Sequence, residues 1–181
     1  MKTWIRISTL LAIITTIVMP VYLFGQQDAK DNKLIDDSKY AKGQFIKTDK
    51  LMANLFDKSS GYVIFPNVGK GAVGVGGAAG NGILFENGNP VGKASMKQVS
   101  VGFQFGGQAY REVIFFENEA ALDRFKQDKI EFDARASAVA ANEGAAANVK
   151  YANGVMIFTQ EKGGLMYEAS VGGQKFHYTA F

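Results

Sequence analysis

The chain of 181 residues has no cysteine, one histidine and one tryptophan. Without cysteine there is no disulfide framework, no thiol nucleophile and no thiolate metal site. The single histidine, His177, cannot build an ordinary zinc site alone, and its alternating context indicates a surface or cross-strand residue. No serine stands in a nucleophile-elbow context. The sequence therefore predicts no metal, no cofactor and no catalytic residue, and we do not expect an enzyme.

The N-terminus has the pattern of an export signal. Lys2 and Arg6 precede a mostly apolar tract, residues 7–24. Pro20 interrupts this tract near its end. This resembles a secretory signal peptide, with cleavage expected after Gly25. The alternative is an uncleaved anchor, since about 18 apolar residues could just span a bilayer. We expect a protein of the periplasm or cell envelope, with residues 1–25 as signal peptide and 26–181 as one domain.

Neither sign of charge predominates in the chain. The chain has 20 Lys and Arg against 17 Asp and Glu, and two of the basic residues lie in the expected signal peptide. The remaining domain is thus almost neutral. This balance gives no reason to expect nucleic acid as a partner.

Residues 26–60 form a helical segment in this interpretation. Apolar and small residues recur at spacings of three and four, as on one face of an amphipathic helix. They are Leu34, Ser38, Ala41 and Phe45. A second short helix is predicted over residues 48–58, with Thr48 or Asp49 as its cap.

From residue 61 the apolar period changes to two, which is typical of antiparallel strands with one covered face. In the last predicted strand, Phe176 and Tyr178 alternate with Lys175 and His177. Asn-Gly turn signals stand at 87–88 and 153–154. One helix, residues 118–126, interrupts the strands and is predicted to begin at the cap Asn118.

The segment of residues 61–87 is rich in glycine. The glycines form a predicted structural motif made of Gly69, Gly71, Gly74, Gly76, Gly77, Gly80 and Gly82. Val73, Val75 and Ala79 interrupt them, so we predict ordered strands with bare backbone, approached closely by another backbone or a ligand. Residues 69–74 match a dinucleotide-binding pattern, but that pattern needs a helix to begin there, and these β-formers disfavour one.

Glu131 and Asp133 fall on one face of a predicted strand, about 7 Å apart. Inverting glycosidases separate their two carboxylates by a similar distance. Arg135 continues the same row, however. A solvated charged face is therefore the simpler interpretation.

The chain resembles the SYLF domain family, also called the lipid-binding or yeast-type actin-binding domain family. The likeness covers roughly residues 30–178. It is carried by FIKTDKLMANLFDKSSGYVIFP, by the block Gly69–Gly82, by GFQFGGQAYREVIFF and by VMIFTQEKGGLMYEASVGGQK. Together with the periodicity, it implies an α+β fold of mostly antiparallel sheet, barrel-like or strongly curved, closed by N-terminal helices and one inserted helix.

The resemblance also implies binding to phospholipid head groups through basic residues of the N-terminal helix. These correspond here to Lys39, Lys42, Lys47 and Lys50, and Lys70 in the glycine motif is placed to meet a phosphate. The helical segment carries nearly as many aspartates as lysines, which weakens the electrostatic attraction. The expected export argues against actin as a partner.

We therefore expect a non-enzymatic protein of the cell envelope that binds phospholipid or a membrane surface. Two alternatives remain open. One is a small outer-membrane β-barrel, and the other is a structural envelope protein without a lipid ligand. The sequence predicts no particular protein partner.

Overall fold

The computed structural model describes residues 28–73, 75–99, 109–130, 137–162, 169–170 and 173–181. The expected signal peptide and the Glu131–Asp133 row lie outside these residues. The chain divides into two compact units, residues 1–33 and 34–181. Within the first unit, residues 28–33 are helical. None of the helices in the described ranges is long and apolar enough to span a bilayer.

The second unit begins with a helix over residues 34–48, which is called the N-terminal helix below. The predicted stripe is confirmed, because Ser38, Ala41 and Phe45 are buried and Leu34 is half-buried. The following helix α2 spans Met52–Lys58 and is shorter than predicted.

The buried side chain of Asp49 lies just before this helix. Its Oδ1 accepts the main-chain N–H of Leu51 at 3.0 Å, and its Oδ2 accepts that of Ala146 at 2.9 Å. Asp49 therefore accepts the N–H two residues on, as an N-cap acid does, but in the turn that precedes α2, and it also binds a distant loop.

Eight strands form one sheet in the order β7-β5-β6-β4-β1-β2-β3-β8. Their bounds are β1 Gly61–Val73, β2 Val75–Glu86, β3 Asn89–Val99, β4 Ala109–Phe116, β5 Ser137–Ala140, β6 Val155–Glu161, β7 Ala169–Ser170 and β8 Gln174–Ala180. Among the described pairings only β5 with β6 is parallel. The predicted α+β class with a mostly antiparallel sheet is confirmed.

The hairpin turns follow the sequence prediction. Asn87 and Gly88 join β2 to β3 with φ of 50° and 78°. Asn153 and Gly154 precede β6 with φ of 53° and 78°. Two successive positive φ angles are the geometry that Asn-Gly favours in tight hairpins.

Helix α3, Glu119–Lys126, is the predicted inserted helix. The side chain of Asn118 accepts the N–H of Ala121 at 3.0 Å, as an N-cap does. Leu122 and Phe125 of this helix are buried against the sheet. The predicted beginning of this helix is therefore confirmed.

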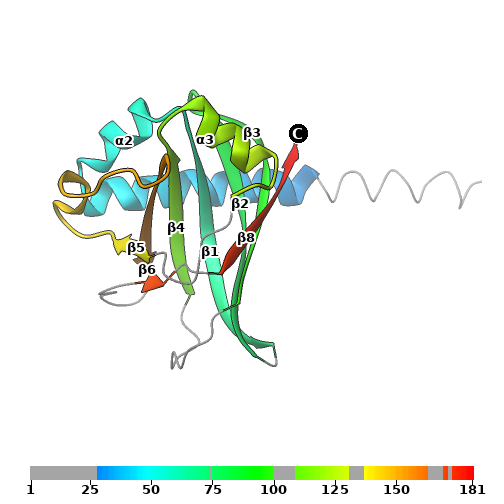
Figure 1. The fold of residues 1–181 in the computed structure, drawn as a ribbon. Coiled ribbons are helices and arrows are strands. Elements are labelled where there is room, and N and C mark those ends of the chain that lie inside the picture. The colour runs from blue at the N-terminus through cyan, green and yellow to red at the C-terminus, as the bar shows by residue number, and fades with distance from the viewer. Residues whose placement is uncertain (1–27, 74, 100–108, 131–136, 163–168, 171–172) are drawn as a thin grey trace, which may run out of the picture. The chain divides into compact units, whose positions relative to one another are not determined.

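Both faces of the central strands are covered. On β1, Val63 and Phe65 enter the core that includes α3, whereas Tyr62 and Ile64 enter the core beneath the N-terminal helix and α2. Figure 1 shows the N-terminal helix passing behind the strands and α3 on the near side. Alternate residues of one strand thus belong to two cores, because successive side chains point to opposite faces.

The sheet is strongly curved. Strands β4 and β8 are separated by three others, which would place them roughly 19 Å apart in a flat sheet. Yet Gln174 Nε2 on β8 donates to Glu112 Oε2 on β4 at 3.0 Å. Gly82 permits this bend, since a Cβ there would lie 2.7 Å from Phe65 Cδ1 and closer still to the carbonyl oxygen of Ile64. The described pairings do not join the edge strands β7 and β8, so barrel closure stays a prediction.

Candidate functional site

Three of the predicted lipid-binding lysines lie on the surface. Lys39 and Lys47 are exposed on the N-terminal helix, and Lys50 is exposed in the turn that follows it. Tyr40 and Leu51 follow Lys39 and Lys50 in the chain and are 62% and 43% exposed. Cationic and apolar side chains are thus neighbours in sequence on exposed positions of this segment.

Lys42 is placed differently. It is half-buried, and its Nζ donates to the hydroxyl of Tyr62 at 3.0 Å. The same Nζ lies 4.8 Å from the ring centroid of Phe56 and 4.9 Å from that of Tyr62. Cation–π contacts of this kind stabilise a fold. Lys42 therefore fastens the N-terminal helix to α2 and β1, and its predicted role with lipid is untested.

We expect Lys42→Ala to lower the free energy of unfolding by about 1–2 kcal/mol, because it removes two cation–π contacts and a partly buried hydrogen bond. Lys39→Ala is the matched control on the same helix and should leave stability unchanged within error. Chemical denaturation of the purified proteins measures both. Equal stability of the two variants would contradict the anchoring role of Lys42.

The glycine-rich segment is an ordered hairpin, as predicted. Val73 pairs with Val75, Gly71 with Gly77 and Gly69 with Ala79 along β1 and β2. Residues 61–73 are strand throughout, so no helix begins at Gly71 and the dinucleotide pattern lacks its structural context. Lys70 pairs with Ala78 in this hairpin, while Gly74 lies outside the described residues.

Comparison with known proteins identifies the family of this fold. Residues 97–178 match the Ysc84 family, described as Las17-binding protein actin regulator, whose domain is the SYLF domain. The chain carries a SYLF domain. The resemblance seen in the sequence is thereby confirmed, and SYLF domains are a lipid- and actin-binding type. The match contains β4 to β7 and β8 as far as residue 178, and it excludes the N-terminal helix.

One relative of this SYLF protein is "Beta cell expansion factor A" of Aeromonas veronii. The two are 31% identical over 125 residues, which cover 67% of this chain and 47% of the relative. The chain thus spans about half the length of this curated relative.

The SYLF sheet encloses a buried polar cluster that sequence analysis missed. Glu112 is fully buried on β4, where its Oε2 accepts from Gln174 and its Oε1 has no hydrogen-bond partner among the described residues. Gln174 Nε2 and the Tyr110 hydroxyl each lie 3.4 Å from Gln98 Oε1. The available signal was the charged pair Arg111 and Glu112 in the mostly apolar sequence of β4, AYREVIFF.

This environment changes the acidity of both titratable groups. Burial raises the pKa of Glu112 from its ordinary 4.5 to about 7, although the hydrogen bond from Gln174 acts in the opposite direction. Burial, and then the proximity of Glu112, also raise the pKa of Tyr110 above its ordinary value. Glu112 is therefore partly protonated near neutral pH.

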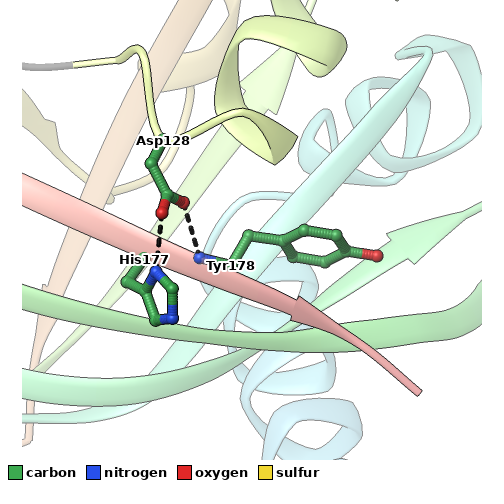
Figure 2. Close-up of polar contacts among 3 residues, drawn as sticks. All are labelled: Asp128, His177 and Tyr178. Carbon is green, nitrogen blue, oxygen red and sulfur yellow. Dashed lines mark hydrogen bonds and ion pairs between the residues drawn. The ribbon is translucent and has the colours of Figure 1, made fainter.

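His177 is exposed, as predicted, and it pairs across strands with Ser95. Figure 2 shows the Asp128 carboxylate between the His177 ring and the Tyr178 main chain. Asp128 Oδ2 lies 2.6 Å from His177 Nδ1, and Oδ1 accepts the Tyr178 N–H at 2.8 Å. Asp128 therefore fastens the segment after α3 to the edge strand β8 and orients the histidine.

Proposed function

We propose that this SYLF protein binds the surface of phospholipid membranes in the cell envelope and catalyses no reaction. Its family is a lipid- and actin-binding type, and the expected export signal directs the choice toward lipid. The envelope location itself rests on the N-terminal pattern of residues 1–25.

The observation that carries the proposal is the exposure of two large apolar side chains and three lysines within residues 39–51, namely Tyr40, Leu51, Lys39, Lys47 and Lys50. Amphipathic aromatic and apolar side chains enter the head-group region, and each nearby lysine adds about 1 kcal/mol of attraction to an anionic surface. Asp36 and Asp37 are exposed on the same helix and oppose this attraction. We therefore expect modest, salt-sensitive binding.

Flotation of the full chain with vesicles tests the proposal. Binding to vesicles of phosphatidylcholine alone is subtracted from binding to vesicles that also contain phosphatidylglycerol. The apolar N-terminus can insert into both kinds of vesicle, so its contribution cancels in the difference. We expect more protein to float with the anionic vesicles at low salt, and the excess to fall at high salt because surface charges are screened. No excess at low salt would favour a structural envelope protein instead.

A variant tests the contribution of the helix. Lys39→Ala, Lys47→Ala and Lys50→Ala combined should reduce the excess bound to anionic vesicles at least about tenfold, because three surface cations are lost. Lys58→Ala, Lys129→Ala and Lys150→Ala combined are the control, since these three lysines are exposed elsewhere. Equal losses in both would mean that only net charge matters.

A further inference from the structure

Two buried oxygen atoms inside the curved sheet lack a hydrogen-bond donor. Glu112 Oε1 on β4 and Gln174 Oε1 on β8 have no partner among the described residues, and both side chains are fully buried. Buried polar atoms are almost always paired, because an unpaired one has given up its hydrogen bonds to water without replacement. The two oxygens therefore call for a donor in this part of the sheet.

The two side chains already share one hydrogen bond. Gln174 Nε2 donates to Glu112 Oε2 at 3.0 Å, and its second hydrogen bond goes to Gln98 Oε1 at 3.4 Å. The Tyr110 hydroxyl also donates to Gln98 Oε1 at 3.4 Å. A primary amide has two hydrogens to donate, so the Gln174 nitrogen has used both of them. It cannot serve either unpaired oxygen.

A proton on Glu112 Oε1 supplies the missing donor. The carboxyl O–H then donates to Gln174 Oε1, while Oε2 continues to accept from Gln174 Nε2. Acid and amide are thereby joined by two hydrogen bonds that close a ring. An ionised carboxylate only accepts hydrogen bonds and would leave both oxygens unpaired. Burial acts in the same direction, since it disfavours the charged form and raises the pKa of Glu112 to about 7.

Few charged groups face this acid–amide pair. The titratable residues on its side of the sheet, by strand register, are Tyr110 on β4, Glu161 on β6, Tyr178 on β8 and Lys70, which pairs with the buried Ala78, on β1. Burial and the proximity of Glu112 raise the pKa of Tyr110, so this hydroxyl stays neutral. The lysines of β3 and β8 alternate with the buried residues of those strands and lie on the opposite face.

The pair connects the beginning of β8 to the middle of the sheet. Gln174 is the first residue of β8, whereas Glu112 lies on β4, three strands away. The later part of β8 has other contacts, because Phe176 packs against rings from β1 and α3 and the Tyr178 N–H is bound by Asp128. The beginning of β8 is thus the part whose attachment to β4 depends on the state of Glu112.

We propose that Glu112 and Gln174 form a proton-dependent latch, in which the protonated carboxyl and the amide hold the beginning of β8 against β4, and loss of the proton releases it. Ionisation removes the O–H donor and leaves a charged acceptor facing the carbonyl oxygen of the amide, so attraction becomes repulsion. Opening then lets water reach the carboxylate. The latch is independent of the proposed membrane binding.

Infrared spectroscopy of the full chain tests the protonated pair. A protonated carboxyl has a carbonyl stretch that a carboxylate lacks. We expect a buried-acid band near pH 6 that disappears by about pH 9, because burial places the pKa of Glu112 at about 7. Glu112→Gln should abolish the band, whereas Glu143→Gln, at an exposed position, should keep it.

Hydrogen exchange measures the release of β8. Relative to intrinsic rates, exchange in residues 174–180 should accelerate by up to about tenfold per pH unit between pH 4.5 and about 7, and change little above. The closed state keeps the proton in this window, whereas the open state, with Glu112 in water, releases it. In Glu112→Gln an amide hydrogen replaces the proton at every pH, so the acceleration should vanish.

Gln174→Leu provides a second variant that keeps the acid and removes its partner. We expect its carboxyl band at a higher frequency, since the carbonyl group loses its hydrogen bonds, and fast exchange of β8 already near pH 6. An unchanged band would mean that Gln174 is not the partner of the proton and would overturn the latch.

Two further results would contradict the proposal. Absence of the buried-acid band near pH 6 would show that Glu112 is ionised there and that another donor meets the two oxygens. Equal acceleration of exchange in β1 and β8 would show that ionisation loosens the whole sheet and releases no single strand. Acceleration confined to β8, lost in Glu112→Gln and kept in Glu143→Gln, is the result expected of the latch.

Discussion

Replacing Glu112 by glutamine is expected to stabilise the protein at pH 8 by up to about 3 kcal/mol and to change its stability little near pH 5. The carboxyl is fully buried, and burial raises its pKa from 4.5 to about 7. Glutamine has nearly the same shape as the protonated acid but does not ionise. The variant therefore avoids placing a charge inside the sheet.

The direction follows from proton binding. Between pH 4.5 and about 7 the folded protein keeps the proton of Glu112, whereas the unfolded chain, with an ordinary pKa, releases it. The folded state binds more protons in this window, so the free energy of unfolding falls as pH rises through it. Urea denaturation at several pH values should show this fall for the unmodified chain and a smaller one for Glu112→Gln.

Glu143→Gln is the control, because Glu143 is exposed. It removes the same ionisable group at the surface and should leave the pH dependence intact. A difference between Glu112→Gln and the unmodified chain that stays constant from pH 5 to pH 8 would contradict the buried, proton-retaining carboxyl.

Gly82→Ala is expected to destabilise the fold by about 2–3 kcal/mol, because a Cβ there collides with main-chain atoms of Ile64 and with the Phe65 ring. A flexible side chain could move aside, but the β1 backbone is held by its partners on both sides. Thermal and urea denaturation measure the loss.

Gly69→Ala provides the comparison within the same hairpin. Its added methyl group meets nothing within 4 Å, so we expect equal or slightly greater stability than the unmodified chain. If the two substitutions had equal effects, the curvature of the sheet would not depend on close approach at Gly82.

Several elements were predicted correctly from local sequence patterns. The cap Asn118 could be predicted because capping depends on residues within one turn of the helix. The Asn-Gly turns could be predicted because only a few residue types accept two positive φ angles in succession. The glycine-rich hairpin was predicted because β-formers interrupt its glycines.

Helix α2 begins at Met52, after the predicted residue 48. The second bond of Asp49 was not predicted, because it reaches Ala146, 97 residues away, and no local pattern reports such a contact. The different placement of Lys42 and Lys39 has a similar origin. Their local contexts are alike, but Lys42 lies over the rings of Phe56 and Tyr62, which become neighbours only when the helices pack on the sheet.

The sequence by itself determined the family and the order of a helical segment followed by strands. Only the tertiary structure decided which of those residues meet one another. Strand register placed Lys97 opposite Lys175, and curvature brought Glu112 to Gln174 across three intervening strands. Register and curvature are set by packing between residues far apart in the chain, so the pairing of Lys97 with Lys175 and the buried carboxyl exist only in the folded protein.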